Sequence, residues 1–413
     1  MSNETHQRAT QVARASYGRL LAILAAGSGD IASAEDALAD AFHRALETWP
    51  VKGIPDKPEA WLMRVAKNRQ IDRHRSSAIR NHVGLDDYQA LNISSIDQPC
   101  DPMEDQRLKL MFVCAHPAIA HEIRTPLMLQ TVLGFEAHEI ARAFVVSPTA
   151  MAQRLVRAKH KIRDAGIPFV IPPREELAQR LDVVLEAIYG AFSIDWTCTD
   201  TRDQTDDMSL EALYLADLLA AMLADEPEAW GLAALIAFTL ARRSARRDKN
   251  NAFVPLDQQN VELWDKRLLR HGELCLKRAS KPANPGRFQL EAAIQSVHCD
   301  RAKTGSVDWH IITRLYEGLC RVAPTLGAFV GRAAAVGHAI GPQEGLACLE
   351  NLDASLQENF QPALATRAWL LARNNKNTDA AVIYKKAIAC TTNAGDRRYL
   401  EGQLSLILKS PTS

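Results

Sequence analysis

Apolar residues recur every three or four positions along most of the chain, which is the spacing of amphipathic helices. Residues 8–26 and 34–48 show this spacing near the start of the chain. A loop marked by Pro50 and Pro55 separates them from a third helical stretch, residues 58–75. The pattern predicts an all-α fold, with three helices in the first part of the chain.

The helical pattern continues far beyond a proline-marked boundary at residues 167–173. Helices are expected over residues 174–191, 209–224, 228–243, 260–280, 287–299, 307–322, 326–340, 362–373, 377–391 and 396–409. The strings RLYEGLCRVAP and AAVIYKKAIAC share a tyrosine followed by small and apolar residues, as in tetratricopeptide-like helix pairs. The similarity is degenerate and defines no fixed period. Residues 174–413 are therefore predicted to form a larger helical, tetratricopeptide-like domain.

Residues 136–164 have the pattern of a helix, a tight turn and a second helix. The second helix carries apolar residues at i, i+4, i+7 and i+11: Met151, Leu155, Ala158 and Ile162. We expect this face to pack on Ile140 and Phe144 of the first helix. Ser147 followed by Pro148 is a suitable N-cap and first-turn pair for the second helix. The stretch predicts a helix-turn-helix.

The neighbouring face of the second helix is basic. Arg154, Arg157 and Lys161 share one stripe, with Ala150 and Gln153 beside it, at about 100° per residue. The chain carries no acid between Arg142 and Arg163, and its basic residues there are Arg142, Arg154, Arg157, Lys159, Lys161 and Arg163. Such a helix fits the major groove of DNA. A basic run is also typical of a solvated face, so this stretch alone leaves both interpretations open.

Two acidic residues stand one turn apart on the helix predicted over residues 34–48. Asp36 and Asp40 are like charges at i and i+4, which costs an isolated helix roughly 0.2–0.5 kcal/mol and so suggests a basic partner. The alternative is that Asp36 complements the helix N-terminus. Ser33 and Asp36 match a capping box, so we expect the helix to begin at Ser33.

The helix predicted over residues 58–75 is basic in its second half, which carries Lys67, Arg69, Arg73 and Arg75. These side chains complement the helix C-terminus. Together with Asn68 and Gln70 they also form a face able to contact phosphates and bases. Trp61 is expected to lie in the core rather than to serve as a base-stacking platform.

Composition adds little, because lysine plus arginine and aspartate plus glutamate both number 49 in the 413 residues. The distribution of charge is more informative. Residues 81–105 contain acids and no lysine or arginine, whereas residues 106–170 contain nine basic residues and four acids. An acidic linker is therefore predicted between two basic blocks. The arginines at residues 242–247 are expected to be a solvated helix end, or a docking patch for an acidic surface.

The eight cysteines form no CxxC pair, which argues against a zinc ribbon and a secreted disulfide framework. Cys114, His116 and His121 are close in sequence, but Pro117 follows the first histidine and no fourth ligand is evident, so no metal is expected. The motifs of nucleotide-binding loops, zinc proteases and serine hydrolases do not occur. We expect a cytoplasmic protein that is not an enzyme, needs no cofactor and has no membrane segment.

Three strings in this order carry a resemblance: AEDALADAF, then KPEAWLMRVAKNRQIDRHR, then EIARAFVVSPTAMAQRLVRAKHKIRDAGIPF after the acidic linker. Together they resemble the second and fourth conserved regions of bacterial extracytoplasmic-function sigma factors. The resemblance implies sigma region 2 at residues 1–80, a linker at 81–105 and sigma region 4 at 106–170. Strings such as FVPLDQQNVELWDKRLL and AAVIYKKAIA resemble the sigma factor subgroup that has a long tetratricopeptide-like C-terminal extension, here residues 174–413.

The resemblance also implies roles for individual residues. Core RNA polymerase would be bound by Asp36, Asp40 and Phe42. The −10 promoter element would be contacted by Asn68, Arg69, Arg73 and Arg75. The −35 element would be read by Thr149, Ala150, Gln153, Arg154 and Arg157. The implied partners are core polymerase, promoter DNA and a regulatory protein at the extension. The competing interpretations are a helix-turn-helix regulator that acts without polymerase, and a helical scaffold.

Overall fold

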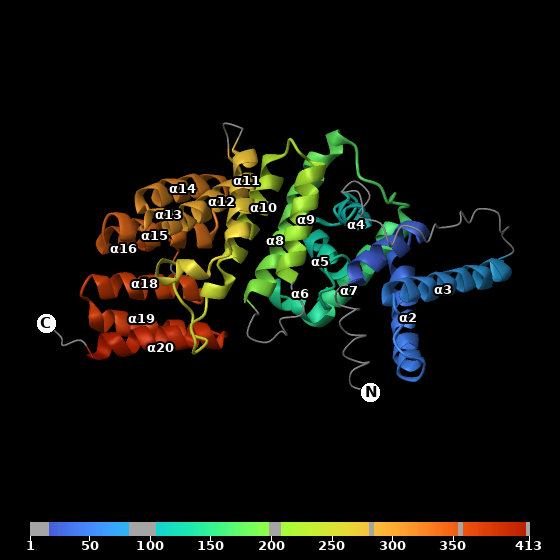
Figure 1. The fold of residues 1–413 in the computed structure, drawn as a ribbon, viewed down its shortest axis with the longest axis horizontal. Helices are drawn as coiled ribbons and strands as arrows, with labels where there is room; N and C mark the ends of the chain where they lie inside the picture. Colours follow the sequence, from blue (N-terminus) through green and yellow to red (C-terminus); the bar gives the residue numbers. More distant parts are fainter. Residues whose placement is uncertain (1–15, 82–104, 198–207, 281–284, 354–357, 410–413) are drawn as a thin grey trace. The chain divides into compact units, whose positions relative to one another are not determined.

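A computed structural model describes the chain except for residues 1–15, 82–104, 198–207, 281–284, 354–357 and 410–413 (Figure 1). It divides into two compact units: Met1–Asp195 with Arg202–Met222, and Trp196–Thr201 with Leu223–Ser413. The regular structure of the described residues is helical, and one isolated antiparallel bridge joins Arg247 to Phe253. The all-α prediction is confirmed. The predicted acidic linker lies almost wholly outside the described residues, and the predicted domain boundaries stay predictions.

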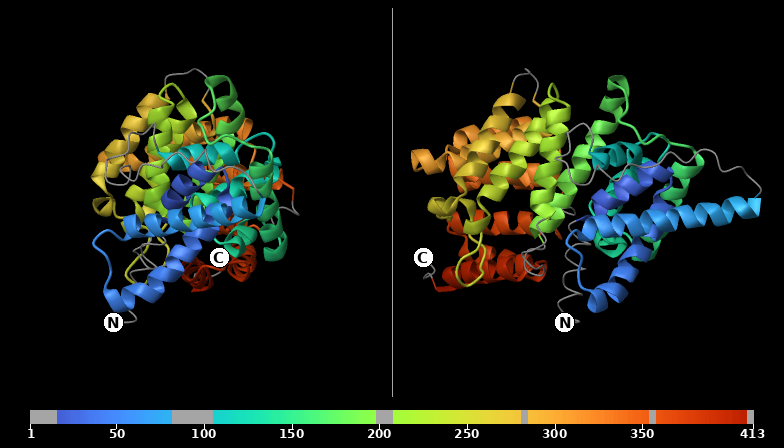
Figure 2. Two further views of the ribbon diagram at one scale, coloured as in Figure 1. Left: turned by 90° about the vertical axis from the view of Figure 1, so that its right-hand side faces the viewer. Right: turned by 45° about the vertical axis from the view of Figure 1, so that its right-hand side comes forward.

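The first unit begins with helical residues 16–28. Its further helices are α2 (Ile31–Lys52), α3 (Pro58–Asn81), α4 (Gln106–Cys114), α5 (His121–Thr131), α6 (Ala137–Ala143), α7 (Pro148–Asp164), α8 (Arg174–Thr197, whose last two residues fall in the second unit) and α9 (Met208–Met222). Figure 2 shows α2 and α3 as long helices. The side chains of residues 73–81 are outside the described part of α3.

The ends of α2 differ from the prediction. The N-cap is Asp30, whose Oδ1 accepts hydrogen bonds from Ala32 N at 3.0 Å and Ser33 N at 3.2 Å, so the expected start at Ser33 is wrong. Asp30 follows Gly29, which has a φ of 68° and ends the preceding helix. At its other end, α2 continues through Pro50 to Lys52, where a loop was expected.

Two tryptophans join α2 to α3. Trp49 is 2% exposed, and its ring meets the half-buried ring of Trp61 edge to face, with the centroids 5.6 Å apart. The expectation that Trp61 belongs to the core is therefore confirmed in this packing. Leu62 and Met63 of α3 are also buried.

The second unit contains α10 (Pro227–Ala241), α11 (Lys266–Ala279), α12 (Arg287–Cys299), α13 (Arg301–Thr304), α14 (Trp309–Val322), α15 (Leu326–Ala339), α16 (Pro342–Glu350), α18 (Gln361–Arg373), α19 (Asn377–Ala389) and α20 (Ala394–Lys409). Short 3-10 turns occupy Arg243–Ala245, Leu256–Gln258 and Val261–Leu263. Most of the helices expected over residues 228–409 are present. The expected helix over 260–280 begins only at Lys266, because Asp265 caps it there, and α13 and α16 were not predicted.

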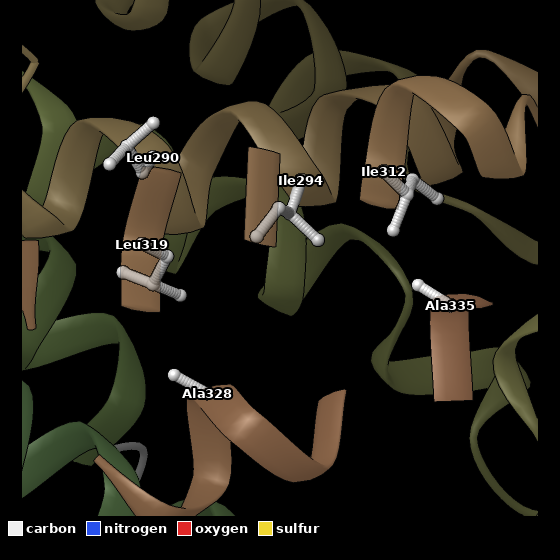
Figure 3. Packing of buried hydrophobic residues seen from close by; sticks show 6 residues of the cluster. All are labelled: Leu290, Ile294, Ile312, Leu319, Ala328 and Ala335. Atoms are coloured by element: carbon white, nitrogen blue, oxygen red, sulfur yellow. The ribbon is translucent and has the colours of Figure 1, made fainter. Parts of the chain in front are cut away.

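The core of the second unit is a series of clusters that share helices. One cluster joins α12, α14 and α15 through residues such as Leu290, Ile312 and Leu319 (Figure 3). The next joins α15, α16 and α18, and a third joins α18, α19 and α20. Each group of helices thus packs mainly on the groups next to it in sequence. We therefore expect the stability of each group to depend on its contacts with those neighbours.

The arginines at residues 242–247 have structural contacts. Arg242 is buried, donates through Nε to Phe238 O at 3.1 Å and contacts Gln295 through Nη2. Arg247 pairs with Asp396 at 3.2 Å and donates to Asn393 Oδ1 at 3.1 Å. For these two residues the expected solvated helix end is wrong, because their side chains tie α10 and the segment after it to later helices.

Candidate nucleic-acid interface

The predicted helix-turn-helix is present as α6 and α7. Glu136 and Glu139 form a capping box at the start of α6. Ser147 Oγ accepts the hydrogen bond of Ala150 N at 3.2 Å and caps α7, with Pro148 in the first turn. The four apolar positions predicted for the inner face of α7 are buried: Met151, Leu155, Ala158 and Ile162. The periodicity of the sequence therefore placed this helix correctly.

The outer face of α7 is accessible. Thr149, Gln153, Arg154 and Arg157 are exposed, and Ala150 is half-buried. Arg157 Nε donates to Gln153 O at 3.4 Å, which keeps this side chain along the helix. The structure thus brings the five residues predicted to read the −35 element onto one accessible face of the second helix of the motif, the helix that enters the groove in helix-turn-helix proteins. Their roles as DNA contacts stay predictions.

Two features of this motif differ from expectation. Phe144 is 40% exposed instead of packing fully in the core, because α6 ends at Ala143 and the chain turns there; Ile140 is buried as predicted. The basic run predicted from the sequence included Lys159, but this side chain is buried in the interior of the first unit. Lys159 follows Leu155 by four residues, so helical spacing could have placed it next to the inner face.

Val145, in the turn of the motif, has a φ of 54° and is 91% exposed. A β-branched residue is strained in this left-handed conformation. We expect Val145→Gly to raise the free energy of unfolding by about 1 kcal/mol, since glycine adopts the conformation without strain. The matched control is Val156→Gly, at a half-exposed position inside α7. This change should lower the free energy of unfolding by about 0.5–1 kcal/mol. Urea unfolding checks both, and equal effects of the two changes would contradict the assignment of strain.

The residues predicted to bind polymerase and the −10 element lie on α2 and α3. Asp36 and Asn68 are exposed, and Phe42 is half-buried. Asp40 Oδ2 accepts from Arg69 Nε at 2.7 Å, so the two helices share an ion pair at the surface. Both side chains are about 40% exposed, and such a pair contributes at most about 1 kcal/mol. Each of the two residues is thus able to leave this pair and bind an external partner instead.

Parts of the predicted −10 surface are outside the described side chains. Arg73 and Arg75 lie on α3, but their side chains are among those that the structure does not describe. Gln70, named with them as part of the polar face, is buried, and its Nε2 donates to Ser28 Oγ at 3.4 Å. Burial lowers the pKa of Lys67 on the same helix. Among the described side chains of α3, exposed Asn68 and partly exposed Arg69 remain as polar groups at the surface.

A largely buried ion pair joins α7 to α2. Lys159 Nζ donates to both carboxylate oxygens of Glu35 at 2.6 Å, and the two side chains are 7% and 21% exposed. Burial raises the pKa of Glu35, and the Lys159 ammonium opposes that shift. Burial and the nearby Glu35 also raise the pKa of Tyr17. One turn further along α7, Arg163 Nη1 lies 3.9 Å from Asp30 Oδ2.

A second buried network joins α4 to α9. The Arg107 guanidinium donates to both carboxylate oxygens of Asp105, with Nε–Oδ1 at 3.1 Å and Nη2–Oδ2 at 2.8 Å, and to Glu211 through Nη1. It also lies 5.1 Å from the centre of the Tyr214 ring, as a cation–π contact. On α8, buried Arg180 donates to Phe112 O at 3.4 Å. Helices α8 and α9 thus form part of the body that carries the helix-turn-helix.

Cys114 lies in the core between α4 and α5. It is fully buried, and its Sγ is 3.6 Å from Thr131 Oγ1. Burial raises the pKa of its thiol to about 12, so it remains protonated at neutral pH. His116 is half-buried and His121 is exposed. Among the described residues, no helix is long and apolar enough to span a membrane.

The comparisons with known proteins agree with this arrangement in part. Residues 12–79 match the sigma-70 region 2 family, and residues 180–280 match a family of unknown function, DUF6596. An uncharacterized protein of Rhizobium meliloti (strain 1021) is 33% identical over 388 residues, which cover 92% of this chain and 91% of that protein. The ECF RNA polymerase sigma factor SigL of Mycobacterium tuberculosis (strain H37Rv) is 28% identical over 137 residues, or 33% of this chain and 76% of SigL. No solved structure matches the chain.

The region 2 match covers α2 and most of α3, the helices that carry the exposed acids and the polar face described above. The Rhizobium meliloti relative extends the similarity over nearly the whole chain, including the second unit. The chain therefore belongs to the same family as this Rhizobium meliloti protein, and residues 12–79 within it are similar to sigma-70 region 2.

Proposed function

We propose that the chain is an alternative RNA polymerase sigma factor of the extracytoplasmic-function type, acting in the cytoplasm to direct core polymerase to a restricted set of promoters. The observation that carries the proposal is the order of two surfaces along one chain. A sigma-70 region 2 comes first, and a capped helix-turn-helix with an exposed basic face on α7 follows it. The similarity to SigL supports the same function.

In this proposal α2 contributes the polymerase contact through Asp36, Asp40 and Phe42. The polar face of α3, with Asn68 and Arg69, contacts the −10 element. Release of Arg69 from Asp40 frees one cation for phosphate and one carboxylate for a basic polymerase surface, at a cost of at most about 1 kcal/mol because the pair is exposed. Arg73 and Arg75 are proposed to extend this contact.

On α7 the exposed stripe is proposed to enter the major groove at the −35 element. Arg154 and Gln153 have the donors that read base edges, whereas Arg157 and Thr149 suit phosphate contacts. The half-buried Ala150 leaves room for a close approach of the backbone. The chain itself performs no chemistry in this function: it binds polymerase and DNA, and the tetratricopeptide-like extension is proposed to regulate it through a partner protein.

The test is transcription with core polymerase. The full-length chain is mixed with core enzyme and a promoter library, and transcripts are mapped by sequencing. The proposal requires co-purification with core enzyme and initiation at a defined set of sites. A chain that binds specific DNA by itself but never associates with polymerase would instead be a helix-turn-helix regulator, and a chain that binds neither would be a helical scaffold.

Substitutions of Arg154 distinguish recognition of base edges from simple attraction between charges. We expect Arg154→Ala to reduce initiation at −35-dependent promoters by roughly 5- to 150-fold, the equivalent of about 1–3 kcal/mol for a lost bidentate contact. Binding to core polymerase should not change. Arg154→Lys keeps the charge but not the planar pair of donors, so it should lose promoter discrimination and retain most of the salt-dependent affinity. Loss of polymerase binding by Arg154→Ala would contradict the assignment of Arg154 to DNA.

A further inference from the structure

The outer face of α11, in the second unit, is strongly basic. The inner face of this helix is buried through Gly272, Cys275 and Ala279. At about 100° per residue, the opposite face carries a set of cations that are all exposed. They are Lys266, Arg267, Arg270 and Lys277, and we call these four residues the α11 basic face.

Within the described part of the chain, none of these cations forms an ion pair with a carboxylate. The acid of the helix itself, Glu273, contacts Lys303 of α13 at 2.5 Å. It does so although Lys277 stands at i+4, where a glutamate commonly finds its partner on a helix. Asp265 is the N-cap of α11 and accepts a hydrogen bond from Arg267 N at 2.7 Å. The acids next to the α11 basic face are thus used elsewhere, and the face keeps its positive charge.

This arrangement costs the helix stability. Lys266 and Arg267 occupy its first turn, where the positive end of the helix dipole disfavours cations. Lys266 and Arg270 are like charges at i and i+4, and Arg267 and Arg270 are like charges at i and i+3, which destabilises a helix further. A solvated face has no interaction that offsets these costs, whereas an anionic partner supplies one.

Duplex DNA matches the α11 basic face better than an acidic protein surface does. Lysine is depleted at the centre of protein–protein interfaces, whereas lysine and arginine together make most contacts to phosphate. The face extends about 16 Å from Lys266 to Lys277, at about 1.5 Å per residue. Because DNA carries one negative charge per about 1.7 Å of its axis, each cation of the face can meet a phosphate. Leu274, which lies among the cations, is 64% exposed, and a single exposed leucine is ordinary at a protein surface.

We propose that the α11 basic face binds the phosphate backbone of duplex DNA without reading its sequence. The inference goes beyond the proposed function, which places the DNA contacts on α3 and α7. It gives the second unit a direct contact with DNA, in addition to the proposed partner protein. Such contacts fix position and add salt-dependent affinity, while base edges are read by other residues of the chain.

The test measures how the full-length chain binds a mixed-sequence DNA duplex that lacks promoter elements, by fluorescence anisotropy at several salt concentrations. The α11 variant combines Lys266→Gln, Arg267→Gln and Arg270→Gln. Each phosphate contact contributes about 0.9 to the slope of log affinity against log salt, so the loss of all three should make the slope shallower by about 2.7. Between about 50 and 200 mM salt, the affinity of the unchanged chain should therefore fall about 40-fold further than that of the variant.

The matched control removes three exposed cations at α19 of the same unit, through Lys376→Gln, Lys385→Gln and Lys386→Gln. This control has the same net charge as the α11 variant, but its slope should equal that of the unchanged chain. Leu274→Gln alters the same side of α11 without changing its charge, and should also leave the slope unchanged. Urea unfolding detects misfolding, because removal of the like charges near the start of α11 should leave the second unit at least as stable as before.

A shallower slope in the α11 variant alone supports the proposal. Equal slopes in all chains overturn it, and so does an equal loss in the α19 control or in Leu274→Gln. If the α11 variant instead weakens association with core polymerase and leaves DNA binding unchanged, the face binds an acidic protein surface and the proposal is overturned. The proposed function fails on a different result, namely that no chain associates with core polymerase and initiates transcription.

Discussion

Replacing Arg107 with methionine is expected to lower the free energy of unfolding of the first unit by about 3–5 kcal/mol, the cost of breaking a buried ion pair by removal of one partner. The side chains of Arg107 and Asp105 are 9% and 6% exposed, so the Asp105 carboxylate would stay buried without its cation. Glu211 and the face of the Tyr214 ring would lose the same partner. Because these groups join α4 to α9, the loss should affect the whole unit.

The measurement is urea unfolding of the full chain followed by circular dichroism, in which the two units can unfold separately. The matched control in the same unit is Arg19→Met. Arg19 pairs with Glu59 at 3.3 Å, but the two side chains are 41% and 36% exposed, so this change should cost less than about 1 kcal/mol. Equal costs at Arg107 and Arg19 would show that the Arg107 network does not hold α9 to α4.

A chain that ends at Pro173 is expected to lose the cooperative unfolding of the first unit, whereas a chain that ends at Ala224 should retain it. The shorter chain lacks α8 and α9, and with them Glu211, which pairs with Arg107. It also lacks Val184 and Ile188, which are fully buried. Each such side chain contributes about 1.5–3 kcal/mol when buried, so these two alone contribute about 3–6 kcal/mol, which is comparable with the lower end of a typical margin of stability.

Thermal and urea unfolding of the two truncated chains check this prediction. The Ala224 chain is also the correct form in which to ask what the second unit does to transcription, since it removes nearly all of that unit and leaves α8 and α9 in place. If the Pro173 chain unfolds as cooperatively and at the same urea concentration as the Ala224 chain, then α8 and α9 are dispensable for the first unit. Regulation by the extension would then be testable with the shorter form.

The sequence predicted the helices well because their information is local. The inner face of α7 follows from the spacing of Met151, Leu155, Ala158 and Ile162, and its start follows from Ser147 and Pro148. Helix ends were predicted less well. Asp30, and not Ser33, caps α2, because Gly29 turns the chain immediately before Asp30.

The buried pairs were missed for a different reason. Lys159 and Glu35 are 124 residues apart, and Arg107 and Glu211 are 104 residues apart. No local pattern relates such positions, so Lys159 was counted with the basic run of α7 and no partner was predicted for Arg107. The available signal was that each lies one helical turn from a buried apolar residue, Lys159 from Leu155 and Arg107 from Met111, since a charge next to an apolar face is buried only when a partner meets it.

By itself, the sequence determined the all-α class, the helix-turn-helix and the basic face of α7, because amphipathic spacing and capping act within a few residues. The tertiary structure alone decided which charges remain available to a partner. It uses Lys159 and Arg107 inside the first unit and leaves Arg154 and Arg157 at the surface. The physical reason is that desolvation of a charge depends on what packs against it, and that is settled by contacts between segments far apart in the chain.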